Sequence, residues 1–170
     1  MSYDELQSEH KEWLSRMYPG QPAMIPAAGV IEETGELLHA ILKLEQFRLW
    51  GKEPRYTPEE LHAKLIDAIG DCGIYVCSLC NARKWDFDIL VTSSFAYFDE
   101  GDALAMAVSL VSDAAKVPSM LWRDASRYMS MLKTLTYKLK LDFYACIMQT
   151  WEEVKERRRE PEAGQGAEAP

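Results

Sequence analysis

A chain of 170 residues is long enough for one domain with a hydrophobic core. Its formal net charge is -8 and its only basic run is at 157–159, so composition argues against a nucleic-acid-binding surface. The N-terminus lacks a basic segment followed by an apolar one, and no apolar stretch reaches the roughly 18 residues that cross a bilayer. We therefore expect a cytoplasmic protein that neither enters nor crosses a membrane.

The first half of the chain predicts three helices. Residues 2–17 have helical composition and are followed by the helix-breaking sequence YPGQP. Apolar residues then recur at helical spacing from about 27 to 50, and Gly51 predicts the end of that helix. Thr57 and Glu60 form a capping-box pattern around Pro58, which predicts a third helix running to about Lys84.

The second half predicts further helices around an irregular segment that is rich in aromatic residues. A helix is expected from about 102 to 116, and one helix or a pair from about 122 to 158. No alternating pattern is long enough to build a sheet, although 89–92 could form one short strand. We expect an all-α domain over 1–160 and a disordered tail at 161–170, whose small and acidic residues cannot bury enough apolar surface to become ordered.

Acidic residues occupy unusual places in the second and third predicted helices. Their spacing of three or four residues brings each group to one helix face, where like charges repel. On a helical wheel Glu33 lies at the edge of the apolar stripe, and Asp71 is surrounded by apolar neighbours along the chain. Carboxylates in such surroundings are protonated, paired or bound to a cation. A hard divalent cation is the simplest explanation, and its candidate ligands are Glu32, Glu33, Glu36, Asp67 and Asp71.

The four cysteines include a Cys77-x-x-Cys80 pair. No second Cys or His pair at zinc-site spacing accompanies it, and three of the cysteines lie in the apolar third helix. We expect reduced cysteines in the core.

The ordered set of motifs resembles the MazG-like all-α nucleoside triphosphate pyrophosphatases, particularly the phage-type members. The matching segments are YPGQP at 18–22, GVIEETGELLHA at 29–40, DAIGD at 67–71 and WEEVKER at 151–157. The resemblance covers roughly 1–85 and 145–158, and the stretch from about 92 to 142 has no counterpart in it and is a candidate insertion. It implies a four-helix-bundle-like fold assembled by oligomerisation, here with extra helices in the C-terminal half.

The resemblance also implies an activity: Mg²⁺-dependent hydrolysis of a nucleoside or deoxynucleoside triphosphate to the monophosphate and pyrophosphate, for control of the nucleotide pool. Two or more Mg²⁺ ions would be held by the five acids, with Mn²⁺ as a substitute, and Glu32 would either bind metal or orient the attacking water. The base is open, with dGTP, dCTP and dUTP as candidates. In a phage-encoded protein the location would be the host cytoplasm.

One departure from the family concerns the second acidic motif. It is usually Glu-x-x-Asp, and the Glu position is Ala68 here. Asp67, one residue earlier, could substitute, because it and Asp71 are one helical turn apart. The number of ligands and of metal ions therefore stays open.

Other residues are candidates for contacts with the substrate. Lys43, Lys155 and Arg158 are expected near the phosphates or on a solvated face. Base recognition requires an aromatic surface with polar groups, for which the candidates are Trp13, Tyr18, Gln21 and Asn81. A homodimer or homotetramer is expected, because the third helix is apolar on nearly every side and a symmetric partner would cover it.

Two alternatives compete with this enzyme class. Glu36-x-x-His39 and Glu59-x-x-His62 match the Glu-x-x-His motifs of carboxylate-bridged di-iron bundles, although His62 is too far along the helix to share a cluster with Asp71. The other alternative is a non-catalytic dimerisation module, or a family member that lost activity together with the Glu at position 68.

Overall fold

The computed structural model describes residues 1–51, 55–94, 102–117 and 121–156, and these residues form seven helices and no strand. The helices are α1 (Tyr3–Met17), α2 (Met24–Trp50), α3 (Pro58–Arg83), α4 (Phe87–Ser93), α5 (Ala103–Ala114), α6 (Trp122–Lys138) and α7 (Phe143–Glu156). The prediction of an all-α chain is confirmed. The stretch expected at 122–158 is the pair α6 and α7.

Local signals set several helix ends as predicted. The Glu60 backbone N–H donates to the Thr57 hydroxyl at 3.2 Å, and the Thr57 backbone N–H donates to the Glu60 carboxylate at 2.7 Å. This capping box starts α3. Gly51 ends α2 with a φ of 68°, a left-handed conformation that glycine adopts without steric cost.

The short strand considered at 89–92 is wrong, because these residues belong to α4. The Asp86 carboxylate accepts a hydrogen bond from the Ile89 backbone N–H at 2.8 Å and so caps the helix. Phe87, Leu90 and Val91 are buried at helical spacing. Helix α2 also begins at Met24, three residues earlier than expected.

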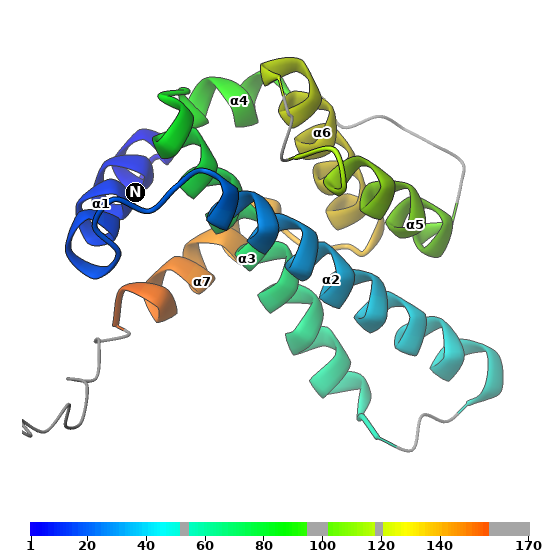
Figure 1. The fold of residues 1–170 in the computed structure, drawn as a ribbon. Helices are drawn as coiled ribbons and strands as arrows, with labels where there is room; N and C mark the ends of the chain where they lie inside the picture. The colour runs from blue at the N-terminus through cyan, green and yellow to red at the C-terminus, as the bar shows by residue number, and fades with distance from the viewer. Residues whose placement is uncertain (52–54, 95–101, 118–120, 157–170) are drawn as a thin grey trace, which may run out of the picture.

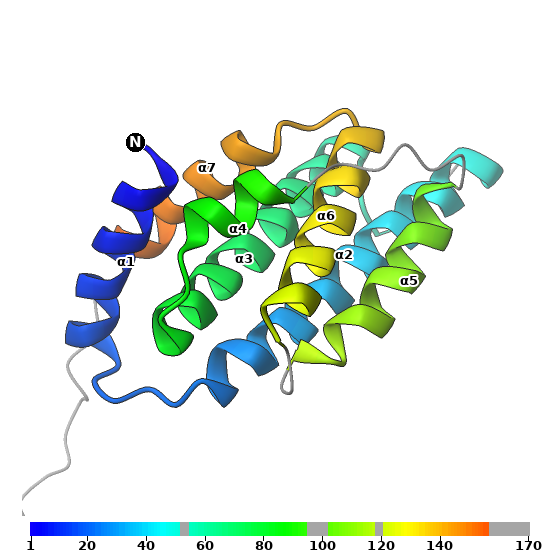
Figure 2. The same ribbon diagram turned by 90° about the horizontal axis from the view of Figure 1, so that it is seen from above.

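The antiparallel pair α2 and α3 is the centre of the fold (Figure 1). Helices α1, α4 and α7 pack against α3, and α5 packs along α2. Helix α6 lies against α5 and α4 and also reaches α3 (Figure 2). The stretch without a counterpart in the resemblance is thus mostly a helical hairpin, α5 and α6, on one side of the central pair.

Helix α3 is covered by helices of its own chain. Over 68–80 every residue is buried except Asp71 and Tyr75, which are one turn apart and partly exposed. By length and hydropathy α3 is the one described helix that could cross a membrane, yet 67% of its most apolar window is buried inside the protein. The apolar surface of α3 therefore does not need a partner copy to cover it, which removes that argument for an oligomer.

Glycines allow α3 to approach α7 closely. A Cβ atom on Gly70 would lie 1.9 Å from the Thr150 hydroxyl oxygen and 2.7 Å from the Cys146 carbonyl oxygen. A Cβ atom on Gly73 would lie 2.5 Å from the Ile147 side chain. The two backbones can pack at this distance only without side chains at these positions.

All four cysteines are free and buried, so the expectation of reduced core cysteines is confirmed. The tail at 161–170, predicted to be disordered, lies outside the described residues.

Candidate functional site

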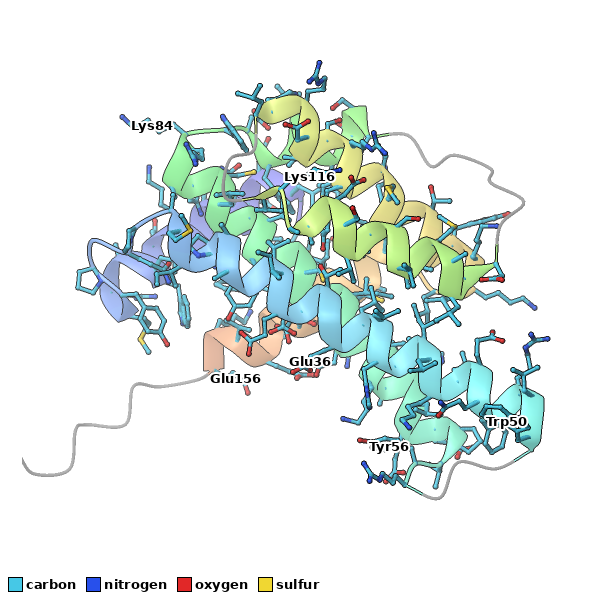
Figure 3. All side chains as sticks on the ribbon, turned by 45° about the vertical axis from the view of Figure 1, so that its right-hand side comes forward. Glu36, Trp50, Tyr56, Lys84, Lys116 and Glu156 are labelled. Carbon is cyan, nitrogen blue, oxygen red and sulfur yellow. The ribbon has the colours of Figure 1, made fainter. Side chains whose placement is uncertain are left out.

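Five acidic side chains of α2 and α3 lie close together on one side of the central pair. Partial burial and, after it, the carboxylates of Asp71, Glu36, Glu32 and Asp67 together raise the pKa of Glu33 to about 7. Figure 3 shows Glu36 on the face of α2 directed away from α5 and α6. The structure thus brings together all five acids that the sequence singled out.

Their exposure differs from the sequence expectation at one position. Asp71 is partly exposed, not enclosed by its apolar neighbours, because within 68–80 it lies with Tyr75 on the one side of α3 that is not buried. Glu33 is also partly exposed, whereas Glu32, Glu36 and Asp67 are exposed. The cluster therefore lies at the surface, where a solvated ligand can reach it.

The donor set of this cluster fits a hard divalent cation. Its members are all carboxylates, the ligand type of Mg²⁺ and Mn²⁺. Mutual repulsion is visible in the raised pKa of Glu33, and a bound cation would relieve it. Within the described ranges no three His, Cys, Asp or Glu side chains already form a group that could hold a metal ion. The residues fit the ion by their donor chemistry, and the four neighbours of Glu33 are close enough to raise its pKa.

A pocket of about 710 Å³ adjoins the acids at Asp71. The end of α1, the connection to α2 and the side of α3 that carries Asp71 and Tyr75 line it, and its wall includes three predicted base-contacting residues, Trp13, Tyr18 and Gln21. The Trp13 and Tyr18 rings make an edge contact at 5.7 Å between centroids. An aromatic pocket beside an acidic cluster can hold a flat apolar group that carries a charged tail.

Tyr75 joins the pocket to the acids, and it was not among the site residues predicted from the sequence. Its ring lines the pocket, and its pKa is raised by burial and then by the carboxylates of Glu33, Asp71 and Glu32. A Cβ atom on Gly29 would lie 2.3 Å from this ring, so the glycine makes room for it against α2. The sequence signal for Tyr75 is its spacing of four residues from Asp71, which places both on one face of α3.

Asn81 lies behind the pocket and does not line it. Its amide nitrogen donates to the Gln7 carbonyl oxygen at 3.3 Å and lies 3.2 Å from His10 Nδ1. With Nδ1 accepting from Asn81, the proton of neutral His10 is on Nε2, which is 3.1 Å from the Ser78 hydroxyl. Burial lowers the pKa of His10 to about 4, so the ring is neutral at physiological pH. Asn81 therefore orients His10, which lines the pocket together with Ser78.

The Trp13 indole N–H is a buried donor in this wall for which the described residues provide no acceptor. An unpaired buried donor costs about 1–3 kcal/mol.

A second, smaller pocket of about 300 Å³ lies at the other end of the acids. It is lined by Glu36, His39 and Ala40 of α2 and by Lys64 and Asp67 of α3. His39 follows Glu36 by three residues, and Lys64 precedes Asp67 by three. Each therefore lies on the same side of its helix as that acid. Two groups that can carry positive charge therefore border the acidic cluster, and neither was proposed as a phosphate contact from the sequence.

The cations that the sequence did propose lie elsewhere or outside the described residues. Lys43 donates to the Gln46 side chain at 3.1 Å on the same helix. Lys155 is exposed and donates to Glu152 at 2.6 Å, and this hydrogen bond raises the pKa of Lys155. Neither lines the two pockets next to the acids. Arg158 falls outside the described residues.

The structure separates the two Glu-x-x-His pairs. Glu36 and His39 border the small pocket, whereas Glu59 and His62 are exposed in the first turns of α3 and do not line it. Ala68 is buried at 3% exposure, while Asp67 shares the small pocket with Glu36. Asp67 therefore lies on the side of the helix pair that a metal ligand would need.

Comparison with known proteins leaves the site to be interpreted from its own chemistry: no protein-family model matches the chain, and searches of the curated proteins and of the solved structures found no match.

Proposed function

We propose that the chain is a Mg²⁺-dependent nucleoside triphosphate pyrophosphohydrolase that releases the monophosphate and pyrophosphate. One observation carries the proposal: partial burial and four surrounding carboxylates raise the pKa of Glu33 to about 7, directly beside a pocket with aromatic walls. Clustered carboxylates that repel each other favour a divalent cation, and the pocket accepts a flat ring. The resemblance of the motifs to the MazG-like family is consistent with this reading.

The chain's own residues have separate roles in this proposal. Glu33, Glu36, Asp67 and Asp71 hold the metal ions, which when bound would neutralise the phosphates. Glu32 either completes this set or accepts a proton from the attacking water. Partial burial of Glu33 and Asp71 strengthens their electrostatic interaction with a bound ion.

The two pockets suggest the direction in which the nucleotide binds. The base would lie in the aromatic pocket with Trp13, Tyr18 and Tyr75, and the triphosphate would cross the acids through bound metal. The terminal phosphates would then approach Lys64 and His39 in the small pocket.

Product analysis tests the reaction. The purified protein is incubated with each common NTP and dNTP plus Mg²⁺ or Mn²⁺, and the products are separated by ion exchange. We expect monophosphate and pyrophosphate from at least one nucleotide and none from the Asp71→Ala variant. Diphosphate with phosphate would contradict the proposed cleavage position, and an active Asp71→Ala variant would contradict the assigned ligand.

The phosphate contact is tested separately with Lys64→Ala. Losing a charge-assisted contact to phosphate raises KM about tenfold, while kcat changes less if the contact is equally strong in ground and transition states. Lys155→Ala is the matched control, because it removes an equally charged side chain that borders neither pocket. Equal KM values for the two variants would remove Lys64 from the site.

A second candidate is a non-catalytic relative. It is favoured by the absence, within the described residues, of a preformed group of three metal-binding side chains. This reading predicts no product from any nucleotide and no rise in melting temperature with Mg²⁺.

A further inference from the structure

A hydrogen-bonded contact between α6 and the acid-bearing helices lies directly behind the acidic cluster. The Tyr128 hydroxyl oxygen is 2.8 Å from the Thr34 hydroxyl oxygen, and the Cys72 sulfur is 3.8 Å from that same Thr34 oxygen. Tyr128 and Cys72 are 0% exposed and Thr34 is 1% exposed. The three side chains come from α6, α2 and α3, so one contact joins three helices.

The direction of these hydrogen bonds follows from counting protons. Thr34 has one hydroxyl proton and donates it to the Val30 carbonyl oxygen at 2.6 Å within α2. The Thr34 oxygen can therefore only accept from Tyr128. Burial raises the pKa of Tyr128 well above its usual value, which keeps the phenol protonated and able to donate. The chain of donors runs from Tyr128 through Thr34 to the α2 backbone.

The position of these residues in the sequence links the contact to the acids. Thr34 follows Glu33 directly and precedes Glu36 by two residues, and Cys72 follows Asp71 directly. Apolar packing alone lets neighbouring helices rotate and slide, whereas a buried hydrogen bond has a preferred length and direction. The contact therefore fixes how the acid-bearing segments of α2 and α3 face each other.

We propose that Tyr128 is a positioning residue, which through Thr34 and Cys72 holds the Glu33 and Asp71 segments in the mutual orientation that metal binding requires. The proposal rests on the proposed function for the role of the metal, but the orientation itself is a property of the metal-free chain. It also assigns a purpose to the α5 and α6 hairpin, which the resemblance leaves without one. Groups that support metal ligands from behind commonly change metal affinity by 10–100-fold when they are removed.

The test compares Tyr128→Phe with Thr136→Val. Both remove one hydroxyl that is 0% exposed on α6, but the Thr136 hydroxyl donates to the Leu132 carbonyl oxygen of the same helix at 2.7 Å. Two measurements are made on each full-length variant. The first is hydrogen exchange of the metal-free protein, followed over residues 31–37 and 67–73. The second is the Kd for Mg²⁺, measured by calorimetry or by thermal shift.

We expect Tyr128→Phe to speed exchange in both segments and to raise the Mg²⁺ Kd about tenfold. Thr136→Val should change neither quantity, even if it lowers the melting temperature as much as Tyr128→Phe does. Exchange in the two segments that is the same in both variants would overturn the proposal, as would an unchanged Mg²⁺ Kd in Tyr128→Phe. Failure of the proposed function shows in the wild-type chain instead, as no Mg²⁺ binding and no product, and the exchange measurement then still decides the orienting role of Tyr128.

Discussion

At the residue scale, Glu33 is held in a position that disfavours its ionised form. Partial burial and four other carboxylates raise its pKa to about 7, and the described residues give it no paired cation. Active sites commonly carry such unfavourable charges because their function requires them. The cost should appear in the stability of the metal-free protein.

Glu33→Gln should therefore stabilise the metal-free protein at pH 8. The folded pKa of about 7 is above the ordinary 4.5, so stability is full below pH 4.5 and decreases as the pH rises through 7. The expected gain is about 1 kcal/mol, reduced from the full electrostatic cost because solvent screens a partly exposed carboxylate. Thermal unfolding in EDTA at pH 4.5 and pH 8 measures the gain, which should be present only at pH 8.

Glu12→Gln is the control for this change, since it removes an exposed acid on α1 away from the cluster. Adding Mg²⁺ at pH 8 should then raise the melting temperature of the wild type and of the control, but not that of Glu33→Gln. Equal stabilisation of all three proteins by Mg²⁺ would argue against Glu33 as a ligand.

His10 predicts a loss of stability in acid. Burial lowers its pKa to about 4 in the folded chain from the ordinary 6.5, so the unfolded chain binds the proton more readily between these values. Stability contributed by the neutral ring is full above pH 6.5 and decreases by roughly 3 kcal/mol as the pH falls to 4. Chemical denaturation at several pH values measures the free energy of unfolding of the wild type and of His10→Gln. Below pH 6.5 this free energy should fall less steeply with decreasing pH in the variant. His62→Gln, at an exposed position, should keep the wild-type slope.

The acids were predictable from the sequence because their spacing of three or four residues lies within single helices. The positions of Tyr75, Lys64 and His39 beside the acids were not, because these positions depend on the register between α2 and α3. That register is set by contacts distant in the sequence, such as the Tyr75 ring against Gly29. Asn81 was misplaced for the same reason, since its partners Gln7 and His10 are on α1.

At the element scale, the contact between α3 and α7 depends on the missing side chain of Gly70. Gly70→Ala should destabilise the protein by roughly 2–3 kcal/mol, because the new Cβ atom would meet the Cys146 backbone, which cannot move aside cheaply. Gly35→Ala, in α2, meets nothing within 4 Å and should stabilise by about 0.5–1 kcal/mol through helix propensity. Urea unfolding of both variants measures the difference. If Gly70→Ala were as stable as Gly35→Ala, then α3 and α7 could move apart without a loss in the free energy of unfolding.

Helix ends were predictable where a side chain or a glycine determines them locally, as at Thr57 and Gly51. Helix α4 was not, because Ile89, Leu90, Val91 and Thr92 have high strand propensity and the run is too short to show a period. Its helical state is determined by the Asp86 cap and by burial of Phe87 and Leu90 in the core.

At the scale of the whole molecule, one chain completes its own core. The apolar surface of α3 is covered by α1, α2, α4 and α7, and α2 is flanked by α5. We therefore expect the melting temperature to be independent of protein concentration over a 100-fold range. Differential scanning fluorimetry measures this directly. A melting temperature that rises with concentration would show that association of subunits contributes to folding.

The expected homodimer or homotetramer is a separate matter from folding, and sedimentation velocity at micromolar concentration decides it. The arrangement of the α5 and α6 hairpin could not be predicted from the sequence. Its contact with the central pair joins residues far apart in the sequence, such as Tyr128 and Thr34, which are 94 positions apart.

The four buried thiols are native probes of helix opening. Cys72, Cys77 and Cys80 are on α3 and Cys146 is on α7, so an alkylating reagent reaches each sulfur only when the helix that carries it opens. Mass spectrometry of the labelled peptides would then give the opening rate of each helix without any engineered probe. The Cys72 label would report on the segment beside Asp71, and slower labelling there in the presence of Mg²⁺ or a nucleotide would reveal binding even where no turnover occurs.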